Sequence, residues 1–347
     1  MLPHSVRKLV QCRFGTSLSK SRKFSSSITS TDLERDPAPF FFKEEVQKLL
    51  RNVTRVDLVK VTRRRKDGTP VGASEYRFMT DKSLQNALEN SKIFIEKRLQ
   101  MPPVVKARKE INEILNKDPE MQGYEASRFV FTDITYNVSN KQRIIVVREP
   151  NGTLRQAKWD ERSRMNQIYF PTKGKEYISP KMFDGEYLMN LLKRREYEFL
   201  MDRACMQFDP DDPDYQRVAK SLYDHINAYK HYNDLRSTRH FGPFVFYLIW
   251  NKDLDNLLLD TLEHCKIEET TDLVKLFYLI HPNDRPESTI DQSDQFVLLN
   301  YYIETQATLK MKLRRALEAY HELKKEKENV NKGIMKQHFI EPPKSEM

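Results

Sequence analysis

Glycine is scarce in this sequence, with 9 residues among 347, whereas soluble domains average about 7% glycine. Loops that cradle a phosphate group need glycine where the backbone must approach the ligand closely. None of the patterns GxGxxG, GxxxxGKS/T and GxSxG occurs in the chain. The sequence therefore lacks support for a dinucleotide-binding domain, a P-loop NTPase or an α/β-hydrolase.

Cysteine and long apolar runs are lacking as well. The 3 cysteines form no CxxC or CxxH pattern, which argues against a disulfide framework and a cysteine-rich zinc site. The 8 histidines include no HExxH sequence. The best apolar run, over 241–250, is well short of the roughly 20 residues of a membrane-spanning helix. We therefore expect no catalytic residue, no metal, no cofactor, no small-molecule substrate and no membrane span.

The first 30 residues are rich in serine and basic residues. They contain eight serines and six lysines and arginines, but no acidic residue. This composition is typical of a mitochondrial transit peptide. The stretch Arg22-Lys23-Phe24-Ser25 resembles a matrix processing site with arginine three positions before the cut, so we predict cleavage between Phe24 and Ser25. A basic tail on a cytosolic protein is the alternative.

The charge of the mature protein is then small. The chain has 59 Lys and Arg against 50 Asp and Glu, a formal net charge of +9. Removing the six basic residues of the transit peptide leaves 53 against 50. Binding to a nucleic acid must therefore depend on local patches of basic residues and not on the total charge.

Two windows, 54–66 and 141–165, are locally basic. Arginine and lysine contacts to phosphates give affinity with little base readout, and the nearby Trp159 and Tyr169 suit stacking on unpaired bases. The predicted RNA-binding residues are Arg63, Arg64, Arg65, Arg148, Arg155, Lys158, Arg162, Arg164, Arg236 and Arg239. The last two, three residues apart, either face RNA or pair with an acidic partner. A solvated surface with local ion pairs is the alternative for the two windows.

The spacing of apolar residues predicts an α+β fold that is mostly α. A small β-hairpin and sheet region is expected in the N-terminal half, and helical hairpins are expected in the C-terminal half. The predicted strands are 56–61 with 75–79 as its hairpin partner, then 129–131, 144–147 and 153–157, with a turn at Pro150-Asn151-Gly152. The predicted helices include 81–99 with Thr80 as N-cap, 160–168, and a long helix over 294–329.

The chain is predicted to have five parts. They are a transit peptide over 1–24, a linker over 25–42, an α+β region over 43–183, a helical domain over 184–331 and a flexible tail over 332–347.

Several segments in this order resemble one family. They are MPPV at 101–104, RFVFTDITY at 128–136, IVVREPNGTLR at 145–155, DLRSTRHFG at 234–242 and LIHP at 279–282. Their order and spacing closely resemble the family of mitochondrial small ribosomal subunit protein twenty-two, from about residue 43 to 325. The resemblance implies a structural, non-enzymatic component of the mitochondrial ribosome in the matrix, which contacts ribosomal RNA and neighbouring ribosomal proteins.

Two other functions remain open from the residues alone. One is a matrix RNA-binding or translation factor that visits the ribosome transiently. The other is a matrix enzyme with an unconventional site, against which the scarce glycine and the missing motifs argue.

The transit peptide is directly testable. We expect the protein isolated from mitochondria to begin at Ser25, because Arg22 stands three positions before the predicted cut. Mass spectrometry of the N-terminal peptide checks this, and Arg22→Gln should block or move the cut, whereas Arg7→Gln should not. Recovery of an intact N-terminus from mitochondria would contradict the prediction.

Overall fold

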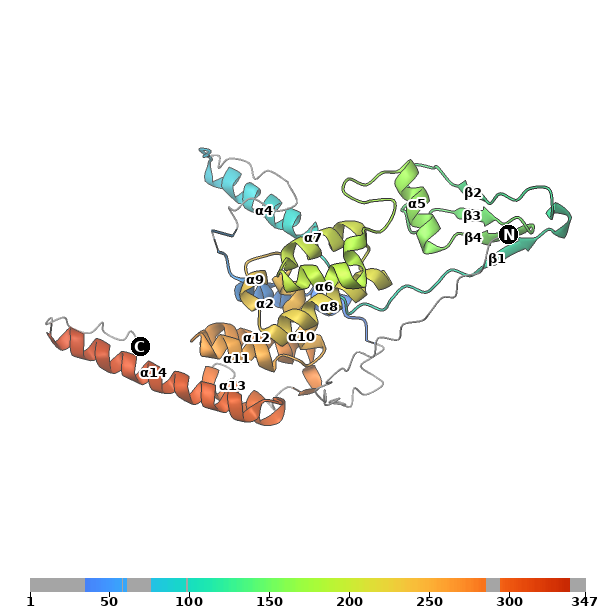
Figure 1. Cartoon of the computed structure of the whole chain (residues 1–347). Coiled ribbons are helices and arrows are strands. Elements are labelled where there is room, and N and C mark those ends of the chain that lie inside the picture. The colour runs from blue at the N-terminus through green and yellow to red at the C-terminus, as the bar shows by residue number, and fades with distance from the viewer. Residues whose placement is uncertain (1–34, 58, 61–75, 98, 285–293, 338–347) are drawn as a thin grey trace, which may run out of the picture. The chain divides into compact units, whose positions relative to one another are not determined.

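The structure is a computed structural model that describes residues 35–57, 59–60, 76–97, 99–284 and 294–337. The chain divides into two compact units, Met1–Asp36 and Pro37–Met347. The second unit contains all the elements below and has the α+β, mostly α composition expected from the sequence (Figure 1). Within the described ranges, no helix is both long enough and apolar enough to cross a membrane.

Among the described residues, the strands lie in the first half of the second unit, and the second half is helical. The strands are β1 (Ile114–Lys117), β2 (Phe129–Thr132), β3 (Ile145–Arg148) and β4 (Thr153–Gln156). The helices up to the end of the sheet region are α1 (Ala38–Phe41), α2 (Glu44–Thr54), α4 (Asp81–Lys97) and α5 (Trp159–Tyr169). The later helices are α6 (Gly185–Lys193), α7 (Tyr197–Gln207), α8 (Pro213–Tyr229), α9 (Tyr232–Leu235), α10 (Phe241–Trp250), α11 (Asp255–Glu263), α12 (Ile267–Ile280), α13 (Gln295–Thr305) and α14 (Lys310–Gln337).

The four strands form one antiparallel sheet in the order β1-β4-β3-β2. The register pairs Val130 with Val147 and Val147 with Arg155, so these three side chains share one face of the sheet. On β3, Ile145 and Val147 are buried, whereas Val146 and Arg148 are only partly buried. Helix α5 follows β4 directly and lies beside the sheet (Figure 1).

A tight turn joins β3 to β4, as the Pro-Asn-Gly sequence predicted. Gly152 has φ +80 and donates its N–H to the carbonyl of Glu149 at 3.0 Å. A Cβ at Gly152 would lie 1.9 Å from the carbonyl oxygen of Asp118. Glycine is therefore required at this position both for the left-handed backbone and for the close approach of the segment after β1.

The sheet has a very small apolar core. Only Ile145, Val147 and Ala157 are buried in it, with Val130 and Met165 of α5 packed against them. Three buried apolar side chains provide little hydrophobic stabilisation for a unit of this size, at about 1.5–3 kcal/mol for each large one. The remaining stability of this region must come from polar contacts, which are described in the next subsection.

The main apolar core lies among the helices. Helix α10 is buried on nearly all sides, and α2 packs against both α10 and α12. Phe41 of α1 is fully buried and meets the ring of Phe246 edge-on at 5.0 Å. Both α1 and α2 therefore belong to the same core as the later helices, although α1 falls within the predicted linker 25–42.

The helix starts follow sequence signals. Thr80 Oγ1 accepts the N–H of Ser83 at 3.3 Å, as expected for the N-cap of α4. Asp212 accepts the N–H of Asp214 at 3.0 Å at the start of α8, and Pro213 occupies the first helical position. Asp209, Asp211 and Asp212 therefore lie in the turn between α7 and α8.

The helix ends are unusual, because residues other than glycine adopt the left-handed conformation there. Arg195, Lys230, Lys252 and Cys265 have φ between 56 and 59 and stand directly after or close to the ends of α6, α8, α10 and α11. After α11, the N–H of Lys266 reaches the carbonyl of Thr261 at 2.9 Å, which is the bond pattern of a Schellman motif. The chain forms these sharp helix ends without glycine, at a cost of about 1–2 kcal/mol each.

The predicted strand at 56–61 is wrong over its described residues. Val59 and Lys60 are helical, and Val56 and Val59 are 76% and 78% exposed. Asp57 accepts the N–H of Val59 at 3.0 Å, which is the cap geometry that begins a helical turn. Residues 76–79 of the expected hairpin partner form no strand either, and the remainder of the predicted hairpin lies outside the described residues.

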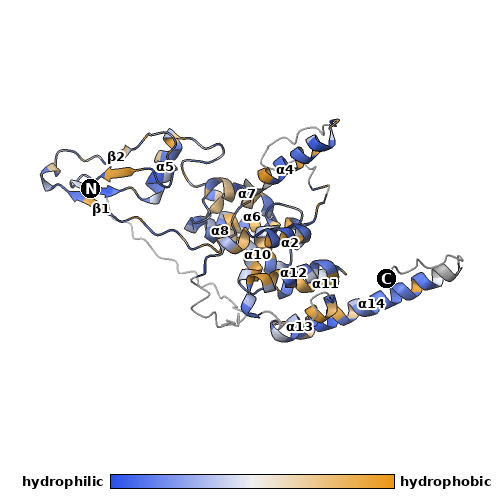
Figure 2. Ribbon diagram, turned by 180° about the vertical axis from the view of Figure 1, so that it is seen from behind, coloured by the Kyte–Doolittle hydropathy of each residue, from blue (hydrophilic) through white to orange (hydrophobic). Residues whose placement is uncertain are grey.

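The predicted long helix over 294–329 is two helices, α13 and α14. Asp255, which is 5% exposed, accepts the N–H groups of Thr308 and Leu309, the latter at 2.9 Å. Its other carboxylate oxygen accepts the hydroxyl of Tyr302 at 3.2 Å. Because these two N–H groups donate to Asp255, the hydrogen-bond pattern of α13 does not continue through residues 308 and 309, and α14 begins after them. Helix α14 is hydrophilic along most of its length (Figure 2).

The chain turns at Arg195, so α6 and α7 are separate helices. Helix α14 continues to Gln337, past residue 332, where the tail is predicted to begin. The boundary predicted at 183/184 falls inside the second unit and stays a prediction.

The role of Asp255 predicts a stability effect. Asp255→Ala should lower the free energy of unfolding by roughly 2–3 kcal/mol, because buried donors lose a charged acceptor. Amide hydrogen exchange should become faster at the start of α14. Glu263→Ala, at the exposed end of α11, is the matched control and should change neither quantity. Equal exchange rates in the two variants would rule out this account of the break.

Candidate nucleic-acid interface

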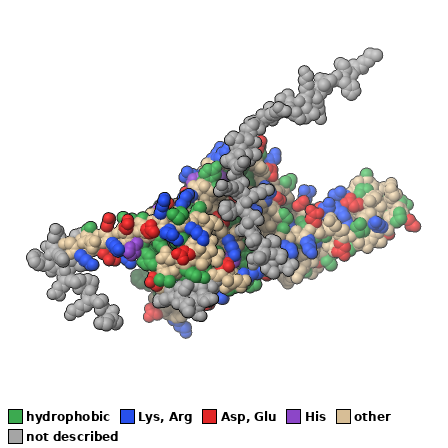
Figure 3. Space-filling model, turned by 90° about the horizontal axis from the view of Figure 1, so that it is seen from below, with side chains coloured by type: hydrophobic (Ala, Val, Ile, Leu, Met, Phe, Trp, Pro, Cys, Tyr) green, Lys and Arg blue, Asp and Glu red, His purple; other side chains and the backbone are tan. Residues whose placement is uncertain are grey.

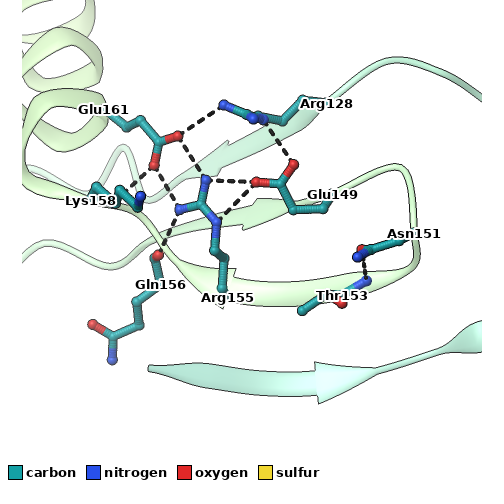
Figure 4. Close-up of polar contacts among 8 residues, drawn as sticks. All are labelled: Arg128, Glu149, Asn151, Thr153, Arg155, Gln156, Lys158 and Glu161. Atoms are coloured by element: carbon teal, nitrogen blue, oxygen red, sulfur yellow. Dashed lines mark hydrogen bonds and ion pairs between the residues drawn. The ribbon is translucent and has the colours of Figure 1, made fainter. Parts of the chain in front are cut away.

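The basic side chains predicted to contact RNA are concentrated in β3, β4 and α5, which with β1 and β2 form the sheet module (residues 114–169). Arg155 of β4 is held between two carboxylates (Figure 4). Its Nη2 lies 2.7 Å from Glu149 Oε1, and its Nη1 lies 2.8 Å from Glu161 Oε2. Arg128 contacts the same carboxylates at 3.0 and 3.3 Å. The four side chains form a closed cluster without net charge.

The local sequence explains why Glu161 is available to Arg155. Glu161 stands in the first turn of α5 and accepts the N–H of Lys158 at 2.9 Å, so it also caps the helix. The hydrogen bond from Arg155 is the main cause that lowers the pKa of Glu161 to about 2. In turn, the hydrogen bond to Glu161 raises the pKa of the Arg155 guanidinium. This ion pair therefore stabilises the module, and Arg155 is engaged within the fold.

Two further arginines are buried in the module, and their hydrogen bonds go to carbonyl groups. Arg162, 6% exposed, donates to the carbonyls of Lys141 at 3.1 Å and Arg143 at 2.6 Å. Arg143, 2% exposed, donates to the carbonyls of Asp133, Thr135 and Val138 and lies 3.8 Å over the ring of Phe170. Burial lowers the pKa of Arg162. These guanidinium groups hold the long β2–β3 connection against α5.

Arg148 occupies an intermediate position. It stands on the face of the sheet opposite to Ile145 and Val147, and its side chain is 23% exposed. Its Nη1 donates to Asp118 Oδ2 at 2.9 Å. Arg148 therefore fastens the segment after β1 to β3 while its side chain stays partly exposed.

Lys158 and Arg164 are different from the other predicted residues. Both side chains are exposed on α5, six residues apart. Within the described part of the chain, neither of them forms an ion pair. Of the predicted residues in the module, these two present their charge to solvent without an internal partner.

Arg236 and Arg239 take acidic partners, one of the two alternatives expected from the sequence. Arg236, 6% exposed, donates to Glu269 at 2.9 Å and lies 3.6 Å from Asp260. Arg239 donates to Asp202 at 2.9 Å through Nε, and the buried His240 contacts the same carboxylate at 2.9 Å. Arg63, Arg64 and Arg65 lie outside the described residues, as do Phe24 and Ser25.

Sequence reasoning did not recognise a cavity of about 410 Å³ between α5, the segment that follows it, and the connection from α7 to α8. Trp159, Arg162 and Asn166 of α5 line it together with Arg108, Lys141 and Lys175. Arg108 pairs with Asp212 at 2.6 Å and lies 4.5 Å over the Trp159 ring. The basic window 141–165 was the available signal, but nothing in the sequence indicated that Arg108 and Lys175 join it.

Charges of both signs are interleaved on the surface. Figure 3 shows Lys and Arg side chains scattered among Asp and Glu on the visible face. Among the described residues, no group of three or more His, Cys, Asp or Glu is arranged to hold a metal ion. The described residues form an α+β scaffold in which several arginines pair with carboxylates or carbonyls inside the fold, whereas Lys158 and Arg164 face outward.

The comparisons with known proteins identify the family of this scaffold. The family model described as Mitochondrial 28S ribosomal protein S22 matches residues 39–282. The chain is 34% identical over 304 residues to small ribosomal subunit protein mS22 of Mus musculus, covering 87% of this chain and 84% of the mouse protein. It is 35% identical over 286 residues to the Bos taurus protein of the same name, covering 82% and 79%. The chain belongs to the mitochondrial 28S ribosomal protein S22 family, which confirms the resemblance found in the sequence.

The Arg155–Glu161 pair predicts how stability depends on pH. The pKa of Glu161 is lowered in the folded state from an ordinary value of 4.5 to about 2. Its contribution is therefore fully present above about pH 5 and is lost as the pH falls toward about 2. Glu161→Gln should lower the stability of the module at neutral pH and flatten its loss on acidification. Hydrogen exchange in β3 and β4 measures this, with Asp160→Asn as control. If the Glu161→Gln protein lost stability on acidification as steeply as the unmodified protein, the assignment would be contradicted.

Proposed function

We propose that the protein, as a structural constituent of the small subunit of the mitochondrial ribosome, works in the matrix by contacting ribosomal RNA phosphates and neighbouring ribosomal proteins. Membership of the S22 family supports the ribosomal role. The serine- and arginine-rich N-terminal sequence without acids supports import into the matrix. The role is structural and involves no catalysis, in keeping with that family.

The RNA contact is proposed to centre on the exposed side chains of α5. Lys158 and Arg164 are exposed and have no carboxylate partner in the described part of the chain, so a phosphate can approach them without breaking an ion pair. Arg148 is a second contact, because its side chain is 23% exposed while it pairs with Asp118. Arg155 and Arg162 support this surface by holding α5 on the sheet. Arg63, Arg64 and Arg65 remain proposed contacts from the sequence alone.

Contacts to neighbouring proteins are proposed for two helices. On α4, Leu84 and Leu88 are 51% and 56% exposed and stand one turn apart on the same side of the helix. On α14, Leu323 and Val330 are 53% and 60% exposed and stand seven residues apart. Apolar side chains in such rows fit the groove of a neighbouring protein better than a phosphate backbone.

The salt dependence of RNA binding tests the α5 surface. Each lost phosphate contact should reduce the slope of log K against log salt by about 0.7 for single-stranded RNA. In the Lys158→Gln/Arg164→Gln double variant, the slope of log K against log salt should therefore be smaller in magnitude by about 1.4, and all RNA sequences should bind more weakly. Filter binding to small-subunit rRNA fragments provides the measurement. Lys220→Gln, an exposed lysine of α8, is the control, and a slope unchanged in the double variant would remove α5 from the interface.

A further inference from the structure

The cavity beside α5 contains a buried positive charge that the fold does not neutralise. Arg162 lines this cavity of about 410 Å³, and its guanidinium hydrogen bonds go to two carbonyls and to no carboxylate. Its Nε has no hydrogen-bond partner among the described residues, although the side chain is only 6% exposed. The guanidinium carbon also lies 5.6 Å from the centre of the Trp159 ring, but no carboxylate offsets its charge, and an anion in the cavity would do so.

A second buried side chain in the cavity also lacks a partner. Asn166, 7% exposed, donates its Nδ2 to the carbonyl of Asn140 at 3.2 Å. Its Oδ1 is buried and accepts no hydrogen bond within the described part of the chain. A buried acceptor without a donor destabilises the fold, and a donor on a ligand would relieve this. The ligand that suits this cavity therefore carries both an anion and an N–H or O–H donor.

The remaining charges leave the cavity positive. Arg108 is neutralised by Asp212 at 2.6 Å, and Lys141 is neutralised by Asp211 at 2.8 Å. Asp209 also lines the cavity and lies 4.0 Å from Arg108, so the cavity keeps a small positive charge. Lys175 also lines the cavity, and within the described residues it forms no ion pair. Lys175 and Arg162 are thus the two cations whose charge is available to a ligand.

We propose that this cavity receives one unpaired nucleotide of RNA, with its phosphate at Lys175 and Arg162 and its base near Trp159 and Asn166. The volume falls in the range of pockets for ligands of this size. The wall around Trp159 combines its indole with the guanidinium groups of Arg108 and Arg162, which lie 4.5 and 5.6 Å from the ring centre, and both indole and guanidinium planes suit contact with a base. This inference rests on the proposed RNA-binding function and names the chemistry of one contact.

Tryptophan fluorescence tests the proposal, because the chain has only 2 tryptophans. In the full chain with Trp250→Phe, Trp159 is the only indole. Adenosine monophosphate and a single-stranded oligoadenylate should each quench it saturably, the oligonucleotide with higher affinity. Lys175→Gln should lower the affinity for each of the two probes by about tenfold, which is the effect expected from the loss of one charge-assisted hydrogen bond. Ser163→Tyr, which fills the cavity, should abolish the quenching.

The controls separate this inference from the proposed function. Lys173→Gln, an exposed lysine two residues from Lys175, should leave both affinities unchanged. The Lys158→Gln/Arg164→Gln variant should bind the oligonucleotide more weakly, whereas its affinity for the mononucleotide should not change. Failure of both probes to quench, or quenching that survives Ser163→Tyr, overturns the cavity site while leaving the α5 surface intact. Quenching by the mononucleotide alone assigns the cavity to a free nucleotide and overturns the RNA contact.

Discussion

The sheet module depends on the ion pairs of Arg155 more than on its apolar core. With three buried apolar side chains, the four strands have too little hydrophobic surface to fix α5 against the sheet. Arg155 joins Glu149 after β3 to Glu161 in the first turn of α5, and Glu161 at the same time caps that helix. A single guanidinium thus links the turn, the sheet and the helix start.

This constraint decides which cations can serve a partner. Arg143 and Arg162 are also used internally, because the connection between β2 and β3 has carbonyl groups that need donors. Lys158 and Arg164 remain outside this network, so they can meet phosphates without the loss of an internal contact. A module held together by arginines can therefore be locally basic in sequence and nearly neutral over much of its surface.

The sequence predicted the fold where local chemistry determines it. Thr80 and Asp212 begin helices, and Gly152 makes the turn between β3 and β4. The sequence did not predict those features that depend on contacts between residues far apart in the chain. Asp255 divides α13 from α14 across more than 50 residues of chain, and β1, fully exposed and without alternation, has no signal of its own.

The candidate site shows the same division between local and distant information. Composition alone identified the basic window but could not separate Lys158 from Arg155, because pairing with Glu149 and Glu161 arises only when β4 and α5 pack together. Lys175 was missed because it reaches the cavity from beyond α5. The left-handed ends at Arg195 and Lys230 carried no glycine to reveal them. Family membership, by contrast, was evident from short segments whose order and spacing are specific.

Ultraviolet crosslinking of purified mitochondrial small subunits, followed by mass spectrometry of nucleotide-modified peptides, tests the central claim most directly. The account predicts that the protein is present at one copy per subunit and that RNA adducts fall on peptides from 157–175, which contain Lys158, Arg164 and Lys175. Peptides that contain Arg236 and Arg239, which are paired with carboxylates of the helical region, should carry none. Adducts confined to the helical core, or a protein absent from the purified subunits, would contradict the account.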